Sequence, residues 1–227
     1  MSFLEIACFS TESALIAQDA GADRIEFCAG LDVGGTTPSL TSFQDLRSQV
    51  TRIPIYIMIR PRGGDFAYSP EEFARMKSEI MNFKSLGSID GFVFGVLDNN
   101  KHVCKDRNRQ LVELAKPAVC TFHRAFDEID ATARLQALED VVACGFQAIL
   151  TSGGAANAEA GSDAIADLVQ AARSRITIIA GGGVRALNVR ALHARTDAAY
   201  FHSSAIRNGE VASRDEVLSL KSELLKQ

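Results

Sequence analysis

The chain has 227 residues, 47% of them hydrophobic and 23% charged, which is an ordinary globular composition. The net charge of −4 and the lack of a basic run argue against nucleic-acid binding, and no apolar stretch reaches the roughly 18 residues of a membrane span. The five cysteines are scattered without a CxxC pair, and no signal peptide is visible. We therefore expect free thiols and a cytoplasmic protein.

Short apolar segments rich in β-forming residues recur along the chain and predict eight strands. In chain order they are residues 3–8, 24–28, 55–59, 91–95, 118–122, 147–150, 176–180 and 198–201.

A helical pattern follows each predicted strand, and helix caps mark several of the starts. The first three helices are expected behind Ser10, at the capping pair Thr41 and Gln44, and from Pro70 to about Leu86 behind a capping box of Ser69 and Glu72. The others are expected before Pro117, at residues 131–143, 162–172 and 186–194, and behind a capping box of Ser213 and Glu216.

Eight strand–helix units at a spacing of roughly 25–30 residues predict a TIM-type (β/α)₈ barrel, as a single domain over residues 1–227. A doubly wound open sheet is the alternative, but it requires a topological switch and usually fewer strands.

Polar residues gather where the predicted strands end, and in a barrel these ends meet at one mouth, where such proteins carry their chemistry. Three arginines there, Arg60, Arg62 and Arg124, are candidates for binding a carboxylate or phosphate through their planar guanidinium groups. A closed ionic network with nearby acidic residues is the alternative, and both interpretations stay open.

Candidates for proton transfer are His123, Glu26 and Asp127, because His123 ends a predicted strand with acidic and arginine residues close by in the sequence. A structural histidine is the alternative for His123. The run of glycines that includes Gly182 and Gly183, together with Ser203, occupies the position where many barrels bind phosphate through backbone N–H groups.

Cys8 and Cys28 end adjacent predicted strands, so their sulfur atoms are candidate ligands for Cu(I), which prefers soft donors. The alternative is that both are small buried apolar residues.

Several of these segments together resemble the CutC copper-homeostasis family, in its order: LEIACFS, GADRIEFC, GGTTPS, IRPRGGDFAYS, TFHRAFD, LTSGG and AGGGV. The resemblance extends to about Ser204 and implies a cytoplasmic TIM-type barrel, often a homodimer, linked to copper binding and tolerance. In the first motif this chain has Ala7-Cys8 where some relatives carry paired cysteines.

Two functions remain open from the sequence. The resemblance implies a Cu(I)-binding homeostasis protein. The polar strand ends favour an enzyme of isomerase, lyase or hydrolase type that acts on a small anionic metabolite.

Overall fold

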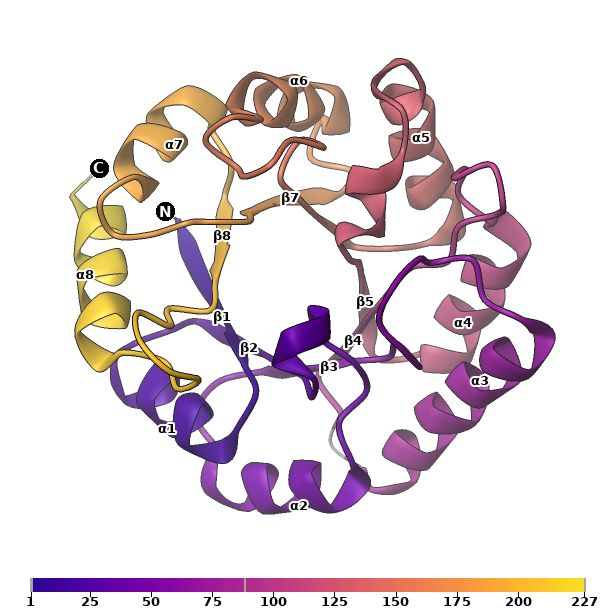
Figure 1. Cartoon of the computed structure of the whole chain (residues 1–227), viewed down its shortest axis with the longest axis horizontal. Helices are drawn as coiled ribbons and strands as arrows, with labels where there is room; N and C mark the ends of the chain where they lie inside the picture. Colours follow the sequence, from indigo (N-terminus) through magenta and orange to yellow (C-terminus); the bar gives the residue numbers. More distant parts are fainter. Residues whose placement is uncertain (1, 88, 227) are drawn as a thin grey trace.

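Eight parallel strands close into a barrel with the helices around it in the computed structural model of the protein (Figure 1). The structure describes residues 2–87 and 89–226. Each strand pairs with the next one in the chain, and β8 closes the barrel by pairing with β1. The predicted (β/α)₈ fold is therefore confirmed, and the closed strand order excludes the doubly wound alternative.

The strands lie within two residues of their predicted bounds. They are β1 (Phe3–Cys8), β2 (Arg24–Phe27), β3 (Ile55–Met58), β4 (Gly91–Phe94), β5 (Val119–Phe122), β6 (Ala148–Thr151), β7 (Thr177–Gly181) and β8 (Tyr200–Ser203).

The α-helices are α1 (Thr11–Asp19), α2 (Leu40–Gln49), α3 (Pro70–Ser85), α4 (Lys105–Ala115), α5 (Arg134–Cys144), α6 (Ser162–Ala172), α7 (Val189–Thr196) and α8 (Arg214–Leu225). Three short 3₁₀ helices lie between these elements: η1 (Leu31–Val33), η2 (Arg124–Glu128) and η3 (Ala131–Ala133).

Local capping explains most helix starts. Ser10 caps α1, and Ser69 and Glu72 form the predicted capping box of α3. The predicted cap of α2 is wrong, because the Ser39 hydroxyl accepts from the Ser42 N–H and starts the helix at Leu40. Ser213 caps α8, but the Glu216 carboxylate accepts from the Ala186 N–H, so it ties α8 to the loop after β7.

Successive side chains of each strand alternate between the barrel interior and the helices. In the register of β1 with β2, Ala7 lies beside Glu26 on the inner face, and Cys8 lies beside Phe27 on the outer face. The outer residues form the large apolar core with the helices. Deep in the interior, the Arg24 guanidinium lies between the rings of Tyr56 and Tyr200, at 4.2 and 4.8 Å from their centroids.

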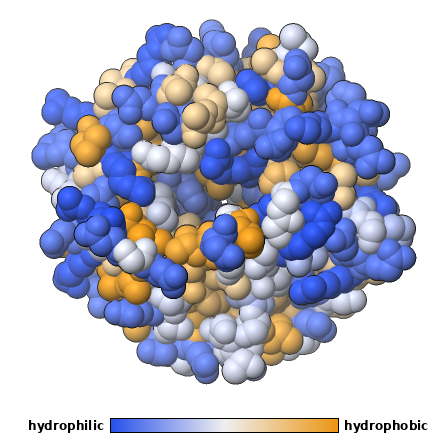
Figure 2. Space-filling model, viewed as in Figure 1, coloured by the Kyte–Doolittle hydropathy of each residue, from blue (hydrophilic) through white to orange (hydrophobic). Residues whose placement is uncertain are grey.

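The loops that follow the strands surround a depression near the centre of one face (Figure 2). The short helix η1, which follows β2, lies across part of this mouth (Figure 1), and its Leu31 lines the cavity below. The fold therefore brings the carboxyl ends of the strands to one partly covered cavity.

Candidate functional site

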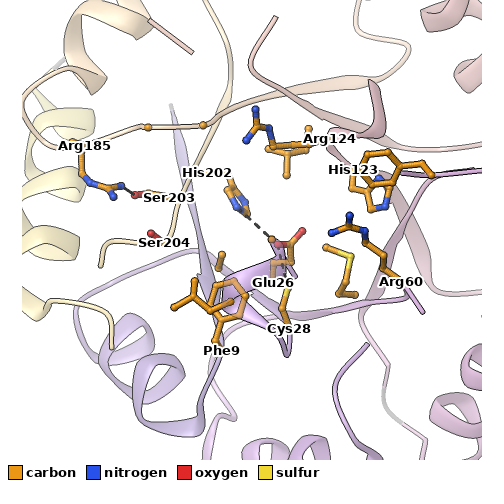
Figure 3. Close-up of a pocket in the computed structure, with 18 residues that line it drawn as sticks. Phe9, Glu26, Cys28, Arg60, His123, Arg124, Arg185, His202, Ser203 and Ser204 are labelled. Carbon is orange, nitrogen blue, oxygen red and sulfur yellow. Dashed lines mark hydrogen bonds and ion pairs between the residues drawn. The ribbon is translucent and has the colours of Figure 1, made fainter. Parts of the chain in front are cut away.

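A cavity of about 240 Å³ opens at the carboxyl end of the barrel (Figure 3). This is below the roughly 300–1,000 Å³ of pockets for drug-sized ligands, so it suits a small metabolite. Most of the residues predicted for the site line it: Glu26, Cys28, Arg60, His123, Arg124, Gly182, Gly183 and Ser203. Arg62, Asp127 and Cys8 do not.

A buried chain of charged groups crosses the floor of the cavity. Arg24 Nε donates to Glu5 Oε2 at 2.5 Å, and Glu5 Oε1 lies 2.7 Å from His202 Nδ1. The other ring nitrogen of His202, Nε2, lies 3.8 Å from Glu26 Oε2, which accepts from the Cys28 thiol at 3.5 Å. The cluster thus runs from the barrel interior to the ligand cavity through His202.

The pKa values of this chain follow from burial and from the charges beside each group. Burial alone raises the pKa of Glu5, but Arg24 and His202 outweigh it and lower the pKa to about 2. Burial raises the pKa of Glu26 by more than His202 lowers it. For His202, burial lowers the pKa, and Glu26 and Glu5 outweigh this and raise it. Glu5 is therefore the fixed anion, and His202 and Glu26 are the groups suited to exchange a proton.

Three residues at the cavity carry a buried polar atom that has no hydrogen-bond partner among the described residues: Glu26 Oε1, Arg60 Nε and His123 Nε2. In Figure 3, the Glu26 carboxylate lies between His202 and Arg60, and His123 lies beside Arg60. Because buried polar groups are nearly always hydrogen-bonded, three such atoms around one cavity indicate a place for a ligand.

Arg60 is a buried cation without an acidic partner. Its NH1 donates to the carbonyls of Val33 and Gly35 at 3.0 Å, and its NH2 donates to the Gly64 carbonyl at 2.8 Å. The guanidinium also stacks on Phe66, with Cζ 4.7 Å from the ring centroid. No carboxylate of the described chain forms an ion pair with it, although Arg60 is only 5% exposed. A buried charge without a counterion favours binding of an anion.

His123 is held in a neutral form. Its Nδ1 accepts from the Ala125 N–H at 3.3 Å, which leaves the proton on Nε2. Burial and the nearby Arg60 charge lower its pKa to about 3. His123 therefore acts as a hydrogen-bond donor through Nε2 and is unsuited to be a cationic acid at neutral pH.

Arg62 faces away from the cavity. Its Nε donates to Glu72 Oε1 at 2.6 Å and its NH2 donates to Asp65 Oδ1 at 2.9 Å, at the start of α3. The ionic-network interpretation holds for Arg62, because the capping carboxylate Glu72 is close enough to bind it. Arg60 and Arg62 are thus separated by the turn at Pro61.

Asp127 organises a loop and does not line the cavity. Its carboxylate accepts from Thr151 Oγ1, from the N–H groups of Ser152 and Gly154, and from Arg124 Nε. With its oxygens satisfied in this way, Asp127 positions Arg124 and the loop after β6. Arg124 lines the cavity, with 45% of its side chain exposed.

The two predicted metal ligands lie on opposite faces of the barrel wall. Cys28 lines the cavity in a small cluster with Met58, and Cys8 lies in the core between the strands and the helices. The register pairs Cys8 with Phe27, so the Cys8 side chain points to the helices while that of Cys28 points to the cavity. Burial raises the pKa of both thiols, and Glu26 raises them further.

Glu5, Glu26 and His202 form the one group of metal-binding residue types found among the described residues, with ligand atoms within 4.8 Å of one another. Both Glu5 oxygens already take part in short contacts, with Arg24 and with His202. The Glu5 carboxylate is therefore satisfied by these two protein partners.

Sequence reasoning missed Glu5, Arg24 and Arg185. The sequence does contain a pattern that could have found Glu5 and Arg24, because each is a charged residue inside an otherwise apolar strand. Side chains alternate between the two faces of a strand, and this alternation places both residues inside the barrel. Arg185 lines the cavity from the loop after β7, and no pattern in the sequence distinguishes it from a surface arginine.

Among the described residues, no helix has both the length and the hydropathy required to cross a membrane.

The model of the CutC family matches residues 2–207. The chain is 42% identical over 202 residues to the copper homeostasis protein cutC homolog of Homo sapiens, covering 89% of this chain and 72% of the human protein. It is 45% identical over 211 residues to a family protein CutC of Xanthomonas campestris pv. campestris strain B100, covering 93% of this chain and 85% of that protein.

Solved structures agree with this relationship. The crystal structure of a CutC protein from Streptococcus agalactiae has a TM-score of 0.84 at 30% identity and covers 90% of this chain and 99% of its own. An aldolase named QR15 has a TM-score of 0.70 at 14% identity, over 100% of this chain and 94% of its own, and shares the fold alone. The chain belongs to the CutC family.

Proposed function

We propose that the protein is an enzyme that moves a proton on a small anionic metabolite bound in the barrel mouth. The observation that carries the proposal is that Glu26, Arg60 and His123 line one cavity and that each carries an unpartnered polar atom, Glu26 Oε1, Arg60 Nε and His123 Nε2. One acceptor and two donors match a substrate with an acidic C–H group beside a carbonyl or carboxylate oxygen.

In the proposed step, the Glu26 carboxylate takes a proton from the carbon next to the carbonyl group. The C–H bond breaks, an O–H bond forms on Glu26, and the electron pair moves to the carbonyl oxygen. The N–H groups of Arg60 and His123 stabilise the negative charge that develops there. In an α-hydroxy carbonyl compound, Glu26 returns the proton to the former carbonyl carbon while the hydroxyl proton moves to the former carbonyl oxygen, and this completes an isomerisation. In a compound with a leaving group on the β-carbon, the enolate re-forms the carbonyl and expels that group with its electron pair, and Glu26 passes its proton to the departing group, which completes an elimination.

The residues below Glu26 support this role. A carboxylate whose pKa is raised is a stronger base, and burial raises the pKa of Glu26. His202, fixed by Glu5 at 2.7 Å, supplies the polar neighbour that keeps the ionised form of Glu26 accessible. Phe66 contacts both Arg60 and His123, so the two donors are held against one ring.

Exchange of substrate hydrogen with D₂O tests the proposal. We expect the wild-type protein to remove a C–H signal, observed by proton NMR, from a member of a panel of small hydroxy acids, oxo acids and sugar phosphates. Glu26→Gln should lower the exchange rate by roughly 10²–10⁴-fold. Glu113→Gln, which removes an exposed carboxylate of α4, is the matched control and should exchange like the wild type. Absence of exchange across the panel, or equal exchange with Glu26→Gln, would contradict proton transfer by Glu26.

A second proposal is Cu(I) binding, and the relatives named copper homeostasis proteins favour it. Cys28 and Met58 lie in one cluster and both line the cavity, so they supply two soft sulfur donors. Anaerobic Cu(I) titration should show a weaker site in Cys28→Ser and an unchanged one in Cys8→Ser, whose sulfur lies outside the barrel wall. Equal affinities in both variants would contradict a site at Cys28.

We further propose, from family membership alone, that the protein is a cytoplasmic homodimer. Light scattering coupled to size-exclusion chromatography measures the oligomeric state, and a mass near the 24.4 kDa of one chain would contradict the dimer.

A further inference from the structure

We propose that the loops after β7 and β8 form a phosphate-binding subsite, and that the substrate is a phosphate monoester whose reacting end lies between Glu26 and Arg60. The subsite consists of Gly182, Gly183, Arg185 and Ser204, all of which line the cavity. The inference rests on the proposed function and adds the substrate class.

The backbone at this position has free donors. Gly182 and Gly183 have φ angles of +94° and +73°, a conformation that glycine adopts without strain. Within the described residues, neither N–H group donates to a protein acceptor, whereas both carbonyls accept, from the Ala158 N–H and the Asn188 amide. A Cβ atom on Gly182 would lie 3.2 Å from Cβ of Ser152 and 3.4 Å from Cζ of Arg124, so the Arg124 guanidinium lies beside this part of the backbone. Two free N–H groups beside a guanidinium are a common anion site.

Arg185 adds a second guanidinium with a fixed orientation. Its NH1 donates to the Val184 carbonyl at 2.8 Å and to Ser203 Oγ at 3.0 Å, and its NH2 donates to the Ile206 carbonyl at 3.3 Å. No carboxylate of the described chain forms an ion pair with it. The guanidinium is therefore held at the cavity by neutral acceptors, with its charge uncompensated, as for Arg60.

The two serines at the end of β8 differ in their free hydrogen-bonding capacity. Ser203 Oγ donates to the Val184 carbonyl at 2.7 Å and accepts from Arg185 and from the Ala205 N–H, so it is saturated and positions Arg185. Ser204 Oγ accepts from the Ile206 N–H at 3.4 Å, and its own proton is available for a ligand. The predicted role of Ser203 in binding an anion thus passes to its neighbour Ser204.

The positions of the cations indicate a substrate with two polar ends. Figure 3 shows Arg185, Ser203 and Ser204 on one side of the cavity, Arg60 and His123 on the other, and Glu26 and His202 between them. A single carboxylate occupies only one of these ends. Backbone amides, the Ser204 hydroxyl and the Arg185 guanidinium lie at one end, and Arg124 lies beside Gly182, which suits the several oxygens of a phosphate. The same position, after strands seven and eight, binds phosphate in many barrels.

Calorimetric titration with inorganic phosphate tests the subsite. We expect the wild type to bind phosphate, Arg185→Gln to weaken binding roughly tenfold or more, and Ser204→Asp to abolish it by placing a carboxylate in the site. Arg207→Gln, which removes an exposed arginine outside the cavity, is the matched control and should bind normally. Glu26→Gln should also bind normally, because Glu26 lies at the reacting end. Ser204→Asp decides the question if Arg185→Gln fails to fold, since Ser204 is only partly buried in a loop.

Absence of phosphate binding by the wild type would overturn the subsite. Binding of phosphate by Arg185→Gln and Ser204→Asp as tightly as by the wild type would also overturn it. So would a change in phosphate affinity, in either direction, confined to Glu26→Gln, since phosphate would then occupy the reacting end. Hydrogen exchange on an unphosphorylated acid without phosphate binding would overturn the subsite and leave the proposed function standing. Phosphate binding without exchange on any substrate would support the subsite and contradict the proton-transfer function.

Discussion

The Nδ1 atom of His202 in β8 lies 2.7 Å from the Oε1 atom of Glu5 in β1, where the first and last strands of the barrel pair. The same carboxylate binds Arg24 of β2. The strand pair that closes the barrel thus also carries the side-chain contact that fixes the imidazole beside Glu26. Stability and the geometry of the site therefore depend on one buried carboxylate.

We predict that Glu5→Gln lowers the free energy of unfolding by roughly 3–5 kcal/mol, because it leaves the buried Arg24 without its anion. Urea unfolding measures the change. Glu113→Gln, at an exposed pair with Lys116, is the control and should change stability by less than about 1 kcal/mol. A loss for Glu5→Gln as small as that of the control would show that the buried pair adds little.

Acid should destabilise the protein through His123. The pKa of His123 is about 3 in the folded protein, against 6.5 for an ordinary histidine. Between these two pH values the unfolded chain binds more protons than the folded protein does. The contribution of the neutral His123 ring to the free energy of unfolding is therefore complete above pH 6.5 and decreases as the pH falls toward 3.

Urea unfolding at pH 7.5 and 5.5 should therefore show a loss of stability that is about 1 kcal/mol larger in the wild type than in His123→Gln. His202, whose raised pKa acts in the opposite direction, is present in both proteins and cancels in the comparison. Identical pH dependence in the two proteins would contradict a neutral, buried His123.

Arg60 and Arg62 should differ sharply in ligand binding. Arg60→Met should weaken binding of a small carboxylate such as glycolate by roughly tenfold or more, since it removes a charge-assisted hydrogen bond. Arg62→Met should bind glycolate like the wild type, because Arg62 is engaged by Glu72 and Asp65 outside the cavity. Thermal-shift titration measures both, with the melting temperature without ligand reporting any loss of fold. Equal weakening in the two variants would contradict the distinction drawn between them.

The thiols should react with iodoacetamide in an order set by burial. Cys104 is only partly buried and should be alkylated first. The other four cysteines are buried, and burial raises the pKa of each, so little of the reactive thiolate forms at neutral pH. Mass spectrometry of a time course at pH 7.5 identifies the modified residues. Modification of Cys28 as fast as Cys104 would contradict the buried position of Cys28.

The fold was predictable because strand length, helix caps and spacing all indicate the same architecture. Helix α6 was predicted at its observed bounds, residues 162–172, and the glycines at 21, 87 and 145, which follow helices, have positive φ angles. Helix α7 was predicted to start three residues early, because the sequence does not reveal that Arg185 and Ala186 serve loop contacts.

The site was only partly predictable, because direction and partner choice depend on three-dimensional packing. Arg60 and Arg62 look alike in the sequence, but only the first turns inward. Cys8 and Cys28 both end adjacent strands, yet the register places them on opposite faces of the wall. Glu5 is 197 residues from its partner His202, so no local pattern joins them.

A crystal structure of the protein with 2-phosphoglycolate tests the central claim most directly, because this compound carries a carboxylate and a phosphate at its two ends. We predict that the carboxylate lies within hydrogen-bond distance of Arg60 Nε and His123 Nε2, beside Glu26, with the phosphate at Gly182 and Gly183. A ligand bound outside the cavity, or in it without contact to Arg60 and His123, would contradict the account.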